Sequence, residues 1–156
     1  MRGRKRKVVA KTDKRKIKSK KQVIDGIEFK SKLEAYMYTC LKREKIPTTY
    51  EGEVYTLMGG FYFGLKSYER QSNAKGDMVD RGNKKIRGIT YKPDFVGDGY
   101  IIECKGFANE SFSLRWKLFK KHLVGVGLDV LLFKPQKRTE CEEVAKIIKE
   151  KLFKNK

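Results

Sequence analysis

The stretch YKPDFVGDGYIIECKG, residues 91–106, contains two short apolar segments separated by the turn Gly97-Asp98-Gly99. Aromatic and β-branched residues on both sides of such a turn predict two antiparallel strands that are neighbours in one sheet. Asp94 lies near the end of the first strand, and Glu103 lies near the end of the second. We therefore expect these two acidic side chains to approach each other across the strand pair.

Side chains alternate between the two faces of a strand, so Glu103 and Lys105 should share one face while Ile102 and Cys104 pack inward from the other. Two close carboxylates repel each other unless a cation lies between them. Carboxylate oxygens suit Mg²⁺, and the Cys104 carbonyl would add a neutral oxygen ligand. A lysine beside them can orient a water molecule or neutralise charge on a phosphoryl group. On spacing alone, an ordinary solvated strand face remains the alternative interpretation.

The rest of the chain predicts a series of helices and strands around this motif. Asp25-Gly26 between apolar pairs indicates a hairpin over residues 23–29. Ser31 is a candidate helix cap, and Ile46-Pro47 ends the helix that it begins. Further along, the patterns predict strands over 53–58, 89–95, 100–105 and 128–133, and helices over 111–124 and from a capping box at Thr139 to the C-terminus.

The predicted order is helix, three strands, helix, strand and helix, which makes the fold class α/β. Residues 59–87 combine glycines, aromatic residues and scattered charges, and this stretch is too long for a simple turn. We interpret it as an insertion that forms its own hairpin and contacts substrate. Trp116 and Phe119 fall on one apolar stripe of the fifth element and are expected in the core.

The chain of 156 residues carries a formal net charge of +19. Residues 1–21 hold 12 Lys or Arg and one Asp, which leaves +8 of this charge for residues 22–156. We predict a basic, disordered arm over 1–21 and a single domain over 22–156. Such a basic surface favours a polyanionic partner, and nucleic acid is the leading candidate.

Other classes of protein are disfavoured by composition. No apolar run is long enough to span a membrane, no secretory signal is visible, and residues 2–21 lack the apolar stripe of a membrane-surface helix. Cys40, Cys104 and Cys141 are widely spaced, and His122 is the one histidine. This composition argues against a disulfide framework and a structural zinc site, and indicates a cytoplasmic protein with buried thiols.

Pro93-Asp94 and Glu103-Cys104-Lys105 resemble the motif of the PD-(D/E)XK nuclease superfamily. The segments 29–34 and 89–95 also resemble phage endonuclease I type Holliday junction resolvases and related small phage endonucleases. The resemblance covers residues 24–133 and implies a restriction-endonuclease-like αβββαβ core, in which helices flank a mixed central sheet. The insertion 59–87 is longer than in endonuclease I, which leaves the substrate preference open.

This resemblance implies a Mg²⁺-dependent DNA endonuclease, with Mn²⁺ as a substitute metal. Asp94, Glu103, the Cys104 carbonyl and Glu34 would bind the metal, and Glu34, Asp94, Glu103 and Lys105 would be the catalytic residues. It also implies branched DNA such as a four-way junction as substrate, a homodimer, 3′-hydroxyl and 5′-phosphate products, and a phage protein that acts in the host cytoplasm. For Glu34 there is a second interpretation, because Ser31 and Glu34 also have the spacing of a capping box.

Three alternatives stay open at the level of sequence. The first is a nicking, homing or restriction-like endonuclease, which the same motif would serve. The second is a non-catalytic basic nucleic-acid-binding protein, for which charge alone would suffice. The third is a scaffold or assembly protein that uses residues 1–21 for electrostatic tethering.

Overall fold

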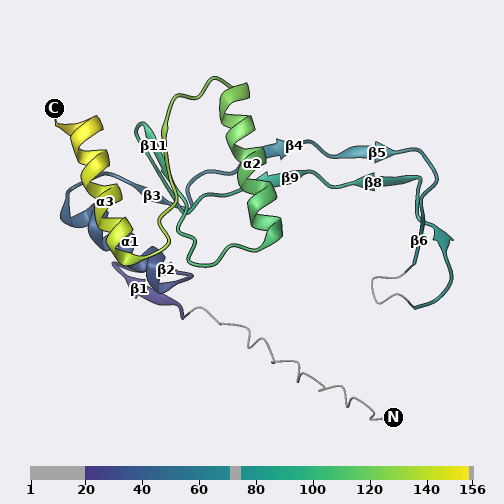
Figure 1. Ribbon diagram of the computed structural model, residues 1–156, viewed down its shortest axis with the longest axis horizontal. Helices are drawn as coiled ribbons and strands as arrows, with labels where there is room; N and C mark the ends of the chain where they lie inside the picture. Colours follow the sequence, from purple (N-terminus) through teal and green to yellow (C-terminus); the bar gives the residue numbers. More distant parts are fainter. Residues whose placement is uncertain (1–19, 71–74, 155–156) are drawn as a thin grey trace, which may run out of the picture.

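The computed structural model describes residues 20–70 and 75–154, so the predicted disordered arm lies outside the described residues except for Lys20 and Lys21. Within these ranges the chain forms three α-helices and a π-helical turn: α1 (Lys32–Arg43), α2 (Glu110–Gly125), α3 (Arg138–Ile148) and η1 (Lys149–Phe153). The predicted mixed α/β class is confirmed (Figure 1). No helix in the described part of the chain has the length and apolarity needed to cross a membrane.

The central sheet has four short strands in the order β12-β11-β10-β3. These strands are β3 (Thr49–Tyr50), β10 (Phe95–Gly97), β11 (Tyr100–Ile102) and β12 (Leu131–Phe133). The pairs β3·β10 and β10·β11 are antiparallel, while β11 and β12 are parallel because α2 lies between them in the chain. The sheet is therefore mixed, as predicted.

Helices cover the two faces of this sheet and create two apolar clusters. Helices α1 and α3 contribute Met37, Leu41 and Ile148 to the first cluster, and α2 contributes Trp116 and Phe119 to the second. Figure 1 shows α2 on the opposite side of the sheet strands from α1 and α3. The prediction that Trp116 and Phe119 belong to the core is confirmed, since they are 9% and 0% exposed.

Three further strand pairs follow one another along a protruding structure that we call the β-ribbon, residues 55–70 and 75–91 (Figure 1). Its strands are β4 (Tyr55–Met58), β5 (Phe61–Phe63), β6 (Tyr68–Glu69), β7 (Val79–Asp80), β8 (Lys84–Ile86) and β9 (Ile89–Tyr91). The pairs β4·β9, β5·β8 and β6·β7 are all antiparallel. The described residues of the predicted insertion 59–87 thus form most of a long hairpin.

The β-ribbon has a joint where two glycines face each other. A Cβ atom on Gly88 would lie 2.7 Å from the Met58 carbonyl oxygen and 3.1 Å from the Gly60 nitrogen. A Cβ atom on Gly60 would likewise lie 3.0 Å from the Ile86 carbonyl oxygen. Only glycine lets the two backbones approach so closely at this point, between β4·β9 and β5·β8.

The hairpin over residues 23–29 is confirmed as β1 (Gln22–Ile24) and β2 (Ile27–Phe29). Asp25 and Gly26 have φ values of 52° and 77°, as a tight two-residue hairpin turn requires. Ser31 is the N-cap of α1, as predicted, and its hydroxyl accepts a hydrogen bond from the Glu34 backbone N–H.

Three predicted elements were wrong in detail. The strand predicted over 53–58 is β4, but it belongs to the β-ribbon, and the edge of the central sheet is formed by β3. The strand predicted over 89–95 divides into β9 and β10, because Pro93 has no N–H for a sheet ladder. Helix α3 begins at Arg138 with no side-chain cap, so the capping box at Thr139 is not formed, although the Glu140 carboxylate accepts a hydrogen bond from the Gln136 N–H.

Candidate functional site

Asp94 and Glu103 lie opposite each other at the end of the β10·β11 pair. Phe95 pairs with Ile102 in the antiparallel register, so the residue before Phe95 faces the residue after Ile102. The backbone N–H of Cys104 donates a hydrogen bond of 2.7 Å to Asp94 Oδ2. The expected approach of the two acids across the strand pair is therefore present, and it is held by a backbone contact.

The segment that carries Glu103 and Lys105 continues beyond β11 along the neighbouring chain. The backbone N–H of Glu103 donates to the Phe133 carbonyl at 3.0 Å, and that of Lys105 donates to the Pro135 carbonyl at 3.0 Å. Cys104 packs into the first apolar cluster together with Ile102, as the strand alternation predicted. All three cysteines are free and buried.

Lys105 lies on the same side of this segment as Glu103. Its Nζ atom is 3.9 Å from Glu103 Oε1 and 4.8 Å from the centre of the Phe112 ring. The Glu103 side chain is 9% exposed and that of Lys105 is 35% exposed. The carboxylate is thus sheltered while the ammonium group reaches solvent, where it can meet an anionic ligand.

Glu34 reaches the same region from the first turn of α1. Its carboxylate accepts hydrogen bonds from the Ser31 hydroxyl at 2.7 Å, the Lys30 backbone N–H at 2.9 Å and the Tyr50 hydroxyl at 2.6 Å. The bonds to Ser31 and Lys30 tie Glu34 to the helix start, but its backbone partner is the Lys30 N–H and not the Ser31 N–H that a capping box would use. Its negative charge nevertheless acts on Asp94 and Glu103, so the three acids form one electrostatic group.

Burial and nearby negative charge make Asp94 and Glu103 hard to ionise. Burial raises the pKa of Asp94 to about 8, and the charges of Glu103 and Glu34 add to the effect. Burial also raises the pKa of Glu103, against the opposing influence of the Tyr91 hydroxyl and Lys105. We call Glu34, Asp94 and Glu103 the acid cluster, and its electrostatics favour a bound proton or a bound cation.

Tyr91 is a member of the site that the sequence did not single out. Its hydroxyl is buried without a hydrogen bond of ordinary geometry to any described residue. Burial and the neighbouring charge of Glu103 raise its pKa, so the hydroxyl stays protonated. Tyr91 fell within the strand predicted over 89–95, but no spacing rule gave its side chain a role, and it is the last residue of β9 in the β-ribbon.

Glu51 was also missed, and it lies on the other side of Asp94 from Glu103. The Tyr50–Phe95 pairing places it opposite Asp94, and its backbone N–H donates to the Asp94 carbonyl at 2.8 Å. The Glu51 carboxylate forms ion pairs with Lys30 and Lys92, the latter at 3.1 Å. Two lysines are thereby held beside the acid cluster. Glu51 follows a two-residue strand, which leaves no pattern that could predict its position.

The residues at this site suit a divalent cation in their chemistry. Carboxylate and carbonyl oxygens are the ligands that Mg²⁺ accepts. Burial and the charges of Glu103 and Glu34 raise the pKa of Asp94, so a cation bound beside it would favour its ionised form. The buried Tyr91 hydroxyl adds an unsatisfied polar atom next to it. In the described ranges 20–70 and 75–154, no three His, Cys, Asp or Glu side chains are already arranged as a metal-binding group. Glu34 is engaged by Ser31, Lys30 and Tyr50, and Asp94 by Cys104.

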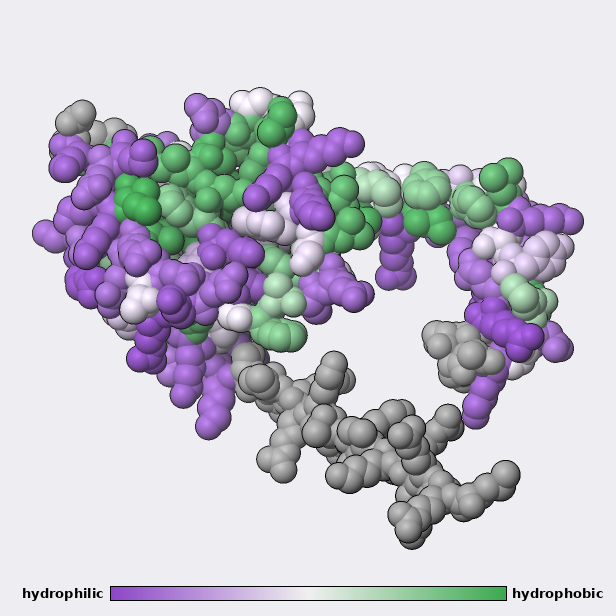
Figure 2. Space-filling model, viewed as in Figure 1, coloured by the Kyte–Doolittle hydropathy of each residue, from purple (hydrophilic) through white to green (hydrophobic). Residues whose placement is uncertain are grey.

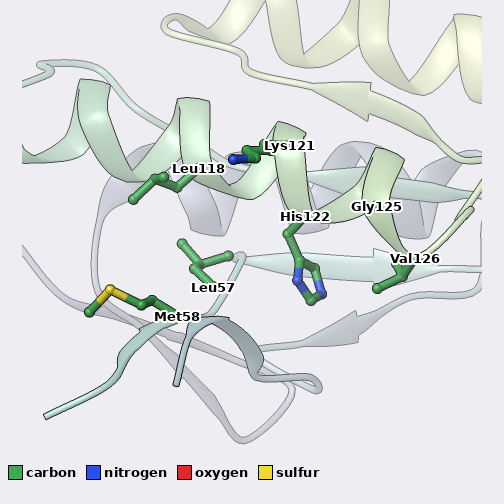
Figure 3. A pocket seen from close by; sticks show the side chains of 7 residues that line it. All are labelled: Leu57, Met58, Leu118, Lys121, His122, Gly125 and Val126. Atoms are coloured by element: carbon green, nitrogen blue, oxygen red, sulfur yellow. The ribbon is translucent and has the colours of Figure 1, made fainter. Parts of the chain in front are cut away.

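An open cavity of about 410 Å³ lies elsewhere, between α2 and β4 (Figure 3). It is lined by Leu57, Met58, Leu118, Lys121, His122, Gly125 and Val126. No member of the acid cluster lines it, and its walls are mainly apolar. Its residues offer one imidazole and one ammonium group but no carboxylate, so we do not assign the site of chemistry to it.

Comparison with known proteins gives a family without an assigned activity. No curated protein and no solved structure matches the chain. The model of a family described as "protein of unknown function (DUF1064)" matches residues 14–140, a range that includes the acid cluster and Lys105. Because this match covers most of the sequence, the chain belongs to the DUF1064 family.

Proposed function

We propose that this protein is a Mg²⁺-dependent DNA endonuclease of the PD-(D/E)XK type. The observation that carries the proposal is the pair Asp94 and Glu103, which face each other across two strands with Lys105 Nζ 3.9 Å from Glu103. The strongly basic chain supplies the charge that DNA binding needs.

The order of elements in the sheet supports the same proposal. Helix α1 precedes β3, β10 and β11, and α2 then leads to β12, which pairs parallel to β11. This αβββαβ order resembles the restriction-endonuclease-like core that the motif implies. The acids lie where β10 and β11 diverge from regular pairing, at an end of the sheet rather than within it.

Each residue of the site has a role in the proposed hydrolysis. Asp94, Glu103, the Cys104 carbonyl and Glu34 would hold Mg²⁺, which when bound supplies Lewis-acid activation of water and of the phosphate. The Lys105 ammonium group would donate hydrogen bonds to a phosphoryl oxygen, whose negative charge grows in the transition state. Glu51 would keep Lys30 and Lys92 in place to contact neighbouring phosphates.

Branched DNA is the substrate that we favour, and a homodimer is the assembly that this choice requires. Resolution of a four-way junction needs two matched cuts, so two copies of the site must act on one substrate. The resemblance to phage junction resolvases supports this choice of substrate and assembly. A stable monomer that cuts linear duplex as well as junctions would leave the endonuclease proposal intact and remove the resolvase assignment.

A cleavage panel tests the proposal directly. Four-way junction, linear duplex and single-stranded DNA are incubated with Mg²⁺ or with EDTA, using wild type, Asp94→Asn and Glu103→Ala. The matched control is Asp129→Asn, because Asp129 is an exposed acid outside the cluster. We expect Mg²⁺-dependent cleavage by wild type and the control but not by the two cluster variants. Undiminished cleavage by either variant would exclude the mechanism, and binding without cleavage by wild type would favour a non-catalytic DNA-binding protein.

A further inference from the structure

The β-ribbon exposes apolar side chains that no core cluster uses. Tyr62, Leu65 and Tyr68 are 67%, 69% and 58% exposed, and Met78 is 56% exposed. Tyr55 and Leu57 at the base pack against the second apolar cluster, but among residues 59–70 and 75–88 none belongs to either cluster. Figure 2 shows hydrophobic residues along the ribbon between the body of the molecule and its far end. This surface contributes little to folding.

Basic side chains lie directly among these apolar residues. Tyr62 pairs with Lys85 and Phe63 pairs with Lys84, so each pair places an aromatic ring and an ammonium group on the same face. Lys84 and Lys85 are exposed and form no ion pair with the described residues. Residues 59–87 contain seven Lys or Arg and three Asp or Glu. A second copy of this basic chain would be repelled here, whereas a polyanion would be attracted.

The shape of the β-ribbon fits the groove of a DNA duplex. A two-stranded β-ribbon is one of the two elements that the major groove of B-DNA admits. From Phe61 to Glu69, over β5, residues 64–67 and β6, this side of the ribbon can extend over at most roughly 26 Å, at about 3.3 Å per residue. One helical turn of DNA is about 34 Å long, so the ribbon can follow most of a turn. The Gly60–Gly88 joint separates this part of the ribbon from the part packed on α2.

The base of the β-ribbon leads directly into the acid cluster. Strand β9 ends at Tyr91, which lies beside Glu103, and Asp94 follows three positions later. Lys92, between them, is paired with Glu51 at the edge of the site. A duplex held by the ribbon would therefore be held at a fixed offset from the catalytic residues.

We infer that the β-ribbon enters the groove of duplex DNA next to the cleaved bond, with Lys84 and Lys85 on phosphates and Tyr62 against the groove wall. This inference deepens the proposed function and rests on it for the position of the cut. The mode of DNA binding itself does not require catalysis. The ribbon sets the register of the duplex, because phosphate contacts position a protein on DNA without reading base sequence.

Two charge-matched double variants of the full-length chain test the contact. Lys84→Ala/Lys85→Ala removes two basic groups from the β-ribbon, and Lys146→Ala/Lys154→Ala removes two exposed ones, from α3 and from the position after η1. Binding of a duplex of about 30 bp, roughly three helical turns, is followed by fluorescence anisotropy in EDTA. Salt is varied between about 50 and 200 mM. The ribbon variant should bind about tenfold more weakly, with a log–log salt slope shallower by about 2, while the control should change Kd by less than about twofold. Equal effects of the two variants would overturn the inference.

A second variant separates the apolar contact from the charges. Tyr62→Ala should weaken duplex binding without changing the salt slope, because no counterion is released by an aromatic side chain. Deletion of residues 61–86, with Gly60 joined to Arg87, should shorten the hydroxyl-radical footprint by about one turn, roughly 10 bp. Unchanged duplex affinity of Tyr62→Ala would overturn the inference even if the deletion variant folds poorly, since Tyr62→Ala alters one exposed side chain. A full-length footprint of a folded deletion variant would overturn it as well.

The outcomes separate this inference from the nuclease proposal. Wild-type chain that binds duplex through the ribbon but never cleaves it would refute the nuclease and support the ribbon contact. Cleavage by wild type, together with unchanged DNA binding by the ribbon variants, would support the nuclease and refute the ribbon contact. Sedimentation velocity tests whether the β-ribbon binds a second copy of the chain instead of DNA. A dimer that dissociates when the ribbon is deleted, while DNA affinity per site is unchanged, would assign the ribbon to the dimer interface and overturn the inference.

Discussion

The backbone N–H of Cys104 donates a 2.7 Å hydrogen bond to the carboxylate of Asp94. This contact joins the two halves of the acid pair, because Cys104 lies between Glu103 and Lys105. It leaves the Cys104 side chain free to pack into the first apolar cluster. One hydrogen bond thus ties the position of Asp94 to the segment that carries the other two functional groups.

Asp94→Asn should change how stability depends on pH. The pKa of Asp94 is about 8 in the folded chain and about 3.9 when unfolded, so the folded state holds a proton that the unfolded state releases. Its contribution to stability is complete below about pH 4 and is lost as pH rises through 8. Relative to Asp94→Asn, wild type should lose on the order of 2 kcal/mol between about pH 5 and 9, after allowance for partial solvent exposure. Urea denaturation across this range measures the difference, and a constant difference would contradict it.

Mg²⁺ should reverse this loss, because a cation competes with the proton for the same carboxylates. The stabilisation by a fixed Mg²⁺ concentration should therefore be larger at pH 8 than at pH 6. Thermal unfolding of wild type and Asp94→Asn at both pH values measures it. A shift that is equal for the two proteins would place the bound cation away from the acid cluster.

Glu34→Gln and Ser31→Ala together separate the two interpretations of Glu34. Ser31→Ala removes the N-cap hydroxyl and should cost about 0.5–2 kcal/mol of stability while leaving cleavage close to wild type. Glu34→Gln keeps an oxygen that can accept hydrogen bonds at this position but removes the charge. It should reduce the rate of cleavage by about 100-fold or more. Single-turnover cleavage and urea denaturation of both variants provide the comparison. Loss of stability with full activity in Glu34→Gln would make Glu34 a capping residue only.

Local patterns accounted for much of the fold. The Asp25-Gly26 turn, the Ser31 cap and the stripe containing Trp116 and Phe119 each depend on residues close together in sequence, and each is present. The Asp94–Glu103 approach was also predictable, because a short turn fixes the register of two consecutive strands.

Contacts between distant segments could not be predicted from these patterns. Strand β3 is two residues long and carries no alternation, yet it brings Tyr50 to Glu34 and Glu51 to Asp94. Tyr91 lies near Glu103 although β9 pairs with β4 in the β-ribbon and does not belong to the central sheet. The motif therefore located the acids, while the neighbours that set their electrostatics came from tertiary structure.

Lys105→Ala should slow the chemical step rather than weaken DNA binding. The Lys105 ammonium group lies 3.9 Å from Glu103, and in the proposed mechanism it would meet the charge that develops on the phosphoryl group. Loss of one such donor typically reduces the rate by about 10²–10³-fold. Lys117→Ala is the control, because Lys117 is an exposed lysine on the neighbouring helix α2. Single-turnover cleavage rates and Kd for the same DNA are compared between the two variants and wild type. A change confined to Kd would mean that Lys105 only binds a phosphate and takes no part in the chemical step.

Phe119→Ala should destabilise the protein and disturb the site through Tyr91. Phe119 is fully buried, and its ring lies 4.5 Å from that of Tyr91 and 5.0 Å from that of Tyr55. Truncation of a buried phenylalanine costs about 3–5 kcal/mol, and the cavity would release Tyr91 from its place beside Glu103. Leu114→Ala on the same helix is the control, since Leu114 is 60% exposed and should change stability by less than about 0.5 kcal/mol. Urea denaturation distinguishes the two variants, and equal stabilities would contradict the packing of α2 against the base of the β-ribbon.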